Sequence, residues 1–183
     1  MKKASYFLTL LALVVLIVPS LVWSEAKPNG SSPVITASFA LEKGYYGYAW
    51  KIYIEAEDPD GDMSKIAAVV HQTGYGHYPT DWIVVKSPYR KQVKGYIQWN
   101  TFSRRTTYLR EWTNITLTIS VFDKAGNESN EVVFPFEFVS GAKGQYQYKL
   151  PTPFDSGDIQ RLGYIHIDLF EPTLMGGDGQ RDR

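Results

Sequence analysis

Apolar and polar residues alternate along several stretches of this chain, and the alternation is clearest between residues 114 and 122. Every second residue there is aliphatic, and the residues between them are mostly threonine or serine. A period of two residues is the pattern of a β-strand with one buried face and one solvated face. The positions predicted to form the buried face are Ile115, Leu117, Ile119 and Val121.

A second alternating stretch ends in a compact acidic turn. Ile52, Ile54 and Ala56 occupy alternate positions, and the segment Asp58–Asp62 that follows reads Asp-Pro-Asp-Gly-Asp. Another apolar stretch comes directly after it. Because Pro and Gly favour tight turns between extended segments, we predict a hairpin that spans residues 48–71.

The same reasoning predicts further strands and no helix. The remaining predicted strands cover residues 33–41, 82–86, 93–99, 132–139 and 162–170. Turns or loops are expected at residues 42–47, 72–80, 87–90, 100–112, 123–130 and 141–157. Pro135 cannot donate a ladder hydrogen bond, so its strand is expected at a sheet edge or with a bulge. The pattern predicts an all-β chain, an antiparallel sandwich of about seven to eight strands with an extra C-terminal strand.

The N-terminal residues have the layout of a secretory signal peptide. Lys2 and Lys3 precede an uncharged apolar run from Phe7 to Trp23, and small residues follow the run. We predict cleavage after Ala26, and an uncleaved membrane anchor is the alternative. The expected location is therefore outside the cytoplasm: periplasmic, at the cell surface or secreted.

These patterns divide the chain into segments. They are a signal peptide (1–26), a flexible leader (27–32), the sandwich (33–140), a connector with the extra strand (141–172) and a disordered tail (173–183). The 183 residues include no cysteine, which excludes disulfides, a thiol nucleophile and cysteine-ligated metals. The net charge of zero argues against a nucleic-acid partner. We expect no membrane span in the mature chain.

Two of the predicted turns resemble those of a known group of domains. One is Glu57–Asp62, and the other is the Asp-x-x-Gly-Asn-x-Ser segment at residues 123–129. Together they resemble the immunoglobulin-like, cadherin-like and fibronectin-type domains of bacterial surface and secreted proteins, over residues 33–140. The resemblance implies an immunoglobulin-like sandwich in which both turns lie at the same end. Residues 70–112 and the extra C-terminal strand depart from that pattern.

The shared end of the sandwich is a candidate calcium site. Calcium prefers several oxygen ligands, which closely spaced aspartate and asparagine side chains supply. The candidate ligands are Asp58, Asp60, Asp62, Asp123 and Asn127. The alternative is turn chemistry, because Asp58, Pro59 and Gly61 satisfy a type I turn without an ion. The turn explains every one of these acidic residues except Asp62. No cofactor other than calcium is expected.

Aromatic residues around a glycine-rich loop are candidate ligand-binding residues. Tyr75, Tyr78 and Trp82 present flat rings of the kind that stack on sugars, and the two tyrosines are expected to be the more exposed. The alternative is that these rings pack in the sandwich core and along its edges.

Other polar groups give weaker indications. His71 and His77 would form a metal pair, and a nearby carboxylate such as Asp81 could join them. The pattern itself indicates no third ligand. The arginines Arg104, Arg105 and Arg110 would dock an anion or form a solvated loop. Three N-x-Ser/Thr sequons begin at Asn29, Asn114 and Asn127.

No catalytic motif is present in the sequence. There is no Gly-x-Ser-x-Gly elbow, His-Glu-x-x-His helix or phosphate loop. Glu55 and Glu57 share one strand face, which a solvated surface explains as well as a catalytic pair. The sequence therefore predicts a non-enzymatic exported module that binds a protein or builds an envelope structure. The alternatives are a carbohydrate-binding module and a calcium-stabilised adhesion module.

Overall fold

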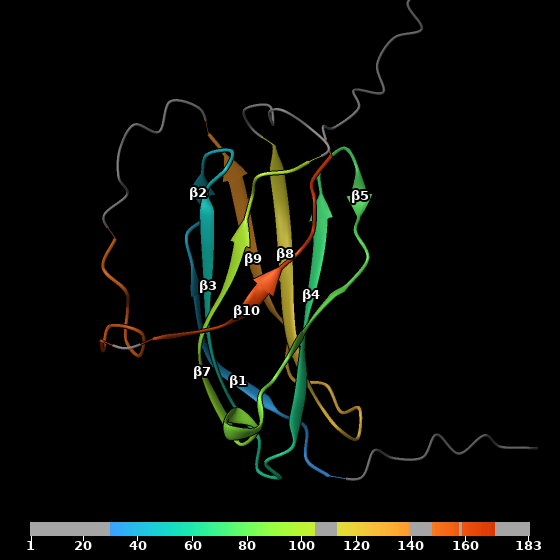
Figure 1. The fold of residues 1–183 in the computed structure, drawn as a ribbon, viewed down its shortest axis with the longest axis vertical. Helices are drawn as coiled ribbons and strands as arrows, with labels where there is room; N and C mark the ends of the chain where they lie inside the picture. Colours follow the sequence, from blue (N-terminus) through green and yellow to red (C-terminus); the bar gives the residue numbers. More distant parts are fainter. Residues whose placement is uncertain (1–29, 105–112, 140–147, 158, 171–183) are drawn as a thin grey trace, which may run out of the picture.

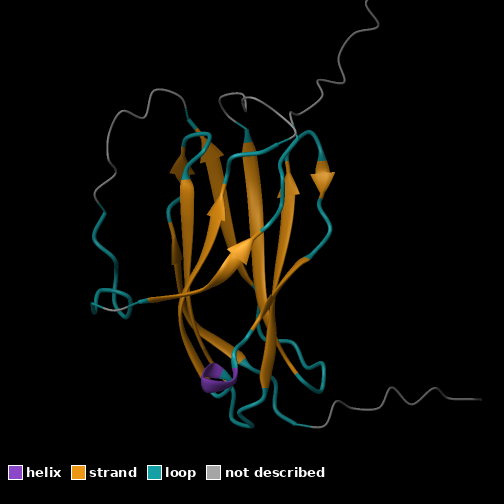
Figure 2. Ribbon diagram, in the orientation of Figure 1, coloured by secondary structure: helices purple, strands orange, loops and turns teal. Residues whose placement is uncertain are grey.

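The computed structural model describes residues 30–104, 113–139, 148–157 and 159–170, and within them the fold is all-β. These residues form ten strands and one short 3-10 turn, η1 (Ser87–Tyr89). The strands make two layers that run along the long axis of the molecule (Figures 1 and 2). The predicted β-sandwich is confirmed, and its layout is compatible with an immunoglobulin-like architecture.

One layer is a four-stranded sheet in the order β1-β3-β7-β10. Its strands are β1 (Val34–Ala40), β3 (Ala49–Glu57), β7 (Gln92–Asn100) and β10 (Gln160–Ile165). The first three strands are antiparallel neighbours, whereas β10 runs parallel to β7. The predicted extra C-terminal strand therefore joins this sheet, but it runs parallel to its neighbour and not antiparallel as predicted.

The other layer is a six-stranded sheet in the order β2-β9-β8-β4-β5, with β6 also paired to β4. Its strands are β2 (Lys43–Gly44), β4 (Met63–Gln72), β5 (Gly76–His77), β6 (Asp81–Val84), β8 (Asn114–Asp123) and β9 (Val132–Phe138). All pairs in it are antiparallel except β2 with β9. The predicted purely antiparallel pairing is thus wrong for one pair in each sheet.

The core lies between the two sheets and is built from the alternating positions. The aliphatic residues predicted to be buried on β8 are buried. Trp50, Trp99 and Phe136 form an aromatic centre, in which the rings of Trp50 and Phe136 are 4.4 Å apart. Both indoles donate to backbone carbonyls, Trp50 to Leu41 at 2.8 Å and Trp99 to Ile167 at 3.0 Å. The core therefore buries large rings without leaving their N–H groups unpaired.

The predicted hairpin at residues 48–71 is wrong in its pairing. The two strands, β3 and β4, exist and are joined by the acidic turn, but they belong to different sheets. β3 pairs with β1 and β7, while β4 pairs with β8, β5 and β6. Alternation shows which face of a strand is buried and says nothing about its neighbour, so the turn crosses between layers.

Three other boundaries differ from the prediction. The expected turn at residues 42–47 contains β2, and the expected loop at residues 72–80 contains β5. The last strand was expected to reach Phe170, but β10 ends at Ile165. Pro135 lies where predicted, on a strand whose side away from β8 is covered only by the short β2.

The open edge of β1 is closed by a single side chain. The amide of Asn130, just before β9, accepts a hydrogen bond from Ile35 N at 2.8 Å and donates one to Ile35 O at 3.2 Å. This contact imitates a strand neighbour at one residue. It also ties the edge of the four-stranded sheet to the chain that enters the six-stranded sheet.

Residues 148–157 contact the outer face of the four-stranded sheet through aromatic side chains. The ring of Phe154 is buried and lies 5.7 Å from that of Tyr53, while Tyr148 packs on Phe39 at 6.0 Å. The connector and extra strand are therefore integrated with the sandwich.

Some predictions fall outside the described residues. They include the signal peptide, the tail at residues 173–183, and two of the arginines, Arg105 and Arg110. Within the described part, no helix has the length and hydropathy needed to cross a membrane.

Candidate binding surfaces

The acidic turn between β3 and β4 is organised by the buried carboxylate of Asp58. Its Oδ1 accepts from the backbone N–H of Asp60 at 3.0 Å, and its Oδ2 accepts from that of Asp62 at 2.9 Å. Asp60 in turn accepts from Ser31 N at 2.6 Å. These are the bonds of an aspartate-stabilised turn, so both oxygens of Asp58 are already engaged by the backbone.

The turn after β8 uses the same chemistry. Asp123 is buried, and its Oδ1 accepts from Asn127 N at 2.8 Å while its Oδ2 accepts from Asn127 Nδ2 at 2.5 Å. Met63, the first residue of β4, pairs with Asp123. The two turns therefore lie at the same end of the sandwich, as the resemblance implied.

Asp62 is the residue of this end that the turns do not satisfy. Its Oδ1 atom is buried and has no hydrogen-bond partner among the described residues. Desolvation, followed by the carboxylates of Asp123 and Asp58, raises the pKa of the Asp62 carboxyl. No group of three or more histidine or acidic side chains within the described residues is arranged to hold a metal ion. The calcium site stays a prediction.

The aromatic residues of the glycine-rich loop do not form one platform. Tyr78 is buried, contrary to the prediction, because its hydroxyl bonds to buried Gln72. Tyr75 is 47% exposed and stacks on Tyr78 and on Phe170, with ring centroids 4.7 Å apart in both cases. Trp82 belongs to another cluster.

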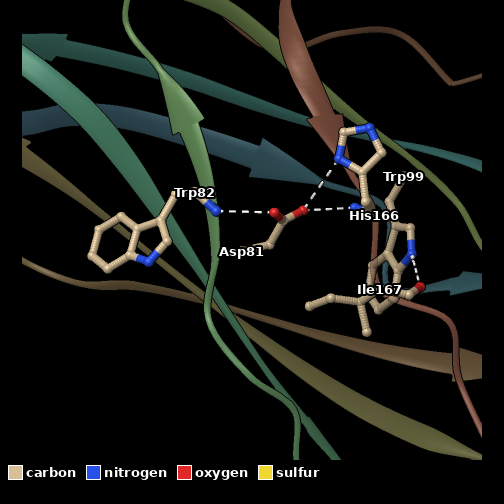
Figure 3. Close-up of polar contacts among 5 residues, drawn as sticks. All are labelled: Asp81, Trp82, Trp99, His166 and Ile167. Atoms are coloured by element: carbon tan, nitrogen blue, oxygen red, sulfur yellow. Dashed lines mark hydrogen bonds and ion pairs between the residues drawn. The ribbon is translucent and has the colours of Figure 1, made fainter.

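Trp82 lies on the outer face of the six-stranded sheet and is 45% exposed. Its ring meets that of Phe122 edge-on at 5.4 Å, and the ammonium of Lys65 lies 3.9 Å from its centroid. In Figure 3 the indole lies on the opposite side of Asp81 from His166. The loop tyrosines and Trp82 are thus two separate sites.

Exposed apolar residues gather on the outer side of the six-stranded sheet around Trp82. Strand register places Val84, Lys65 and Phe122 in one row, and Trp82, Ala67 and Ser120 in the next. A further row contains Val69, Thr118 and Val133. Val84 is 70% exposed and Val133 57% exposed. We call these three rows the outer face; its charged residues are Lys65 and, at the end of the first row, Glu128, which bridges to Phe122.

The predicted histidine pair is only partly assembled. His71 and His77 are cross-strand partners with rings 4.7 Å apart. The Asp81 carboxylate is not part of this pair. It accepts hydrogen bonds from the backbone N–H groups of Trp82 and His166 (Figure 3). A metal site built from both histidines and Asp81 is therefore not formed, because the carboxylate serves another segment.

That segment is residues 166–170, which we call the strap. It follows β10 and runs towards the end of the sandwich where β5 lies (Figure 1). Its backbone is held by side chains of the sandwich. The bonds are His166 N to Asp81 Oδ2 (2.6 Å), Trp99 Nε1 to Ile167 O (3.0 Å), Ser103 Oγ to Leu169 O (2.6 Å), Gln72 Nε2 to Phe170 O (2.7 Å) and Phe170 N to Tyr78 Oη (2.8 Å).

Sequence reasoning missed the residues that hold the strap. Gln72 and Ser103 are polar residues next to loops, where a solvated side chain is the ordinary expectation. Both are buried, with 0% and 1% of their surface exposed. The available signal is weak: a glutamine that ends an apolar strand run.

Comparison with known proteins adds no assignment for these surfaces. No protein-family model matches the chain, and a search of curated proteins found no match either. We therefore infer the function from the geometry of the described residues.

Proposed function

We propose that the chain is an exported, non-enzymatic, immunoglobulin-like module that binds a protein partner through the outer face. The observation that carries the proposal is the exposure of Trp82, Val84 and Val133, at 45%, 70% and 57%, on one sheet surface. Apolar patches of this kind on a polar-rimmed surface are typical of protein interaction sites. Export is supported by the N-terminal sequence pattern.

The composition of the outer face suits a protein partner. Interface cores are poor in charged residues and rich in aromatic ones, and a tryptophan is a frequent anchor of binding energy. Lys65 already lies above the Trp82 ring, where it extends the apolar contact with its methylene stem. Half-buried Thr118, between Val69 and Val133, supplies a hydrogen-bonding group without the cost of burying a charge.

A carbohydrate partner is the second candidate, and the exposed Tyr75 ring is the observation that favours it. Sugar hydroxyls need hydrogen bonds around a stacking ring, whereas Val84 and Val133 provide none on the outer face. One side of the Trp82 ring is also taken by Lys65. A glycan array separates the two candidates, because binding that Tyr75→Ala abolishes would favour a sugar.

The test uses matched exposed apolar residues on the two sheets. Envelope proteins from cells that express the chain are captured with the wild type, with Trp82→Ser and with Val34→Ser. Val34 is 49% exposed but lies on β1. We expect a partner that the wild type and Val34→Ser retain equally, and that Trp82→Ser binds more weakly by about 2 kcal/mol or more.

Two results would contradict this proposal. One is equal capture by all three proteins, which would place any partner elsewhere. The other is hydrolysis of common ester, peptide or glycoside substrates by the purified mature chain, which would contradict the non-enzymatic part.

A further inference from the structure

The strap is bound to the sandwich in the way that a receptor binds an extended peptide. Its main-chain groups are recognised by side chains of Asp81, Trp99, Ser103, Gln72 and Tyr78, in place of a neighbouring strand. Main-chain bonds combined with pockets for alternate side chains are a recurring mode of peptide recognition. We call the site between these side chains the strap groove.

From Ile165, the last residue of β10, aliphatic side chains pack towards the core at every second position of the segment. Ile165 and Leu169 are 4% and 1% exposed, and Ile167 is half-buried between them. His166 is exposed. Phe170 ends the segment by stacking on Tyr75, with the ring planes 12° apart. The strap groove therefore binds a segment that has aliphatic residues at alternate positions and an aromatic residue at its end.

An empty strap groove would be costly for the folded chain. Trp99, Gln72 and Ser103 are 0%, 0% and 1% exposed, and each donates to a strap carbonyl. Removal of the strap would take away the carbonyl oxygens to which Trp99 Nε1 and Gln72 Nε2 donate, and a buried donor without a partner destabilises a fold. The groove consequently requires an occupant, and an incoming segment with the same pattern would satisfy every one of these groups.

The strap is attached in a way that permits it to leave. Among the described strands β10 pairs with β7 alone, at the edge of the four-stranded sheet, so its departure breaks no other ladder there. It is preceded by the exposed residues Asp155, Ser156 and Gly157. A segment taken from another molecule would make the same contacts, and exchange of identical elements is a low-cost route to dimers.

We propose that the strap groove is a peptide-binding site, and that its partner in trans is the β10–strap segment of a second copy of the chain. In the isolated molecule the chain's own segment fills the groove. At high local concentration the segment of one copy replaces that of another and links the two. This surface is separate from the outer face, so the proposal stands or falls independently of the proposed function.

The close approach of β10 to β6 offers a selective test. A Cβ atom built on Gly163 would lie 3.6 Å from the Cβ of Ile83, which is within the range of a disulfide. The native chain has no cysteine. An acceptor copy carries Ile83→Cys. A donor copy carries Gly163→Cys together with Ile83→Ala, which removes the clash between the new Cβ and Ile83 Cγ2.

The two full-length copies are mixed and oxidised, and the disulfide-linked heterodimer is identified by mass spectrometry. The control donor carries Ser156→Cys with Ile83→Ala, because Ser156 is exposed. A chain with both Ile83→Cys and Gly163→Cys tests whether the disulfide closes within one molecule. We expect several-fold more heterodimer with the Gly163→Cys donor than with the control donor.

A synthetic peptide of residues 159–170 provides the second measurement. The peptide should lower the heterodimer yield, and its fluorescent form should bind wild-type protein saturably. The same peptide with Ile167→Asp and Leu169→Asp should do neither, because both aspartates would face the core. The proposal is overturned if the heterodimer does not exceed the control, if the native peptide fails to compete, or if the wild type does not bind it.

Discussion

Asp62 is a carboxylate that the native fold holds in its charged form at a disadvantage. Its neighbours Asp58 and Asp123 are acidic, and its buried Oδ1 lacks a partner among the described residues. Because the pKa of Asp62 is raised in the folded state, the folded protein binds this proton more tightly than the unfolded chain. Stability associated with Asp62 is therefore full at low pH and is lost as pH rises through the folded pKa.

We predict that Asp62→Asn raises the thermal midpoint at pH 7, because it removes the repelled charge. The gain should shrink as pH falls through the raised folded pKa of Asp62 and should vanish below the ordinary aspartate pKa, near pH 3. Thermal melts from pH 3 to pH 7 measure it, with the exposed Glu131→Gln as control. A calcium-dependent rise of the wild-type midpoint that Asp62→Asn abolishes would instead make Asp62 a ligand.

Asn130 acts on the structure through one side-chain amide. We predict that Asn130→Ala lowers the free energy of unfolding by about 1–2 kcal/mol. The backbone N–H and C=O of Ile35 each lose their hydrogen bond to the Asn130 side chain. Urea denaturation measures the loss. Asn100→Ala is the control, since Asn100 is exposed and accepts from the nearby Gln98 side chain. Equal losses in the two variants would show that the clamp contributes nothing specific.

The longer strands could be predicted from the sequence because each buries one face. β8 and β9 carry their apolar residues at every second position, and tight turns separate them. β2 and β5 could not be predicted, because two residues are too few to display a period. The pairing of β3 with β7 is also invisible to alternation, since it joins segments far apart in the chain.

The binding surfaces were less predictable than the strands. The topology implied by the resemblance correctly placed the turns that contain Asp58 and Asp123 at the same end of the sandwich. The burial of Tyr78 did not follow from its glycine-rich surroundings. Tyr78 is buried because its hydroxyl bonds to Gln72, which the structure places at the end of β4, and to Phe170 of the strap. The end of β10 at Ile165 has a similar cause, because side chains replace the ladder beyond it.

The strap should loosen without unfolding of the rest when one of its anchors is lost. Gln72→Leu removes the donor to Phe170 O and the acceptor of the Tyr78 hydroxyl. We predict faster hydrogen exchange at the amides of His166 and Phe170, with little change at Ile119 in β8. Gln98→Leu, on the neighbouring β7, is the control. Uniformly faster exchange across both sheets would contradict a local role.

At the level of the whole molecule, residues 148–157, which we call the extension, are expected to unfold together with the sandwich. Phe154 is 1% exposed and packs on Tyr53 of β3. We predict that Phe154→Ala lowers the free energy of unfolding by about 3–5 kcal/mol and leaves a single cooperative transition. Calorimetry with matched circular dichroism checks it. A separate early transition with an unchanged main one would make the extension an independent unit.

The direction of the chain through the sandwich has a mechanical consequence. β1 begins beside the acidic turns, and the strap ends beside β5 at the opposite pole (Figure 1). A pull on these two points would load β1 along its length, while its antiparallel hydrogen bonds to β3 lie across the force. Many bonds would then share the tension and fail together, so the fold is oriented to carry shear between its poles.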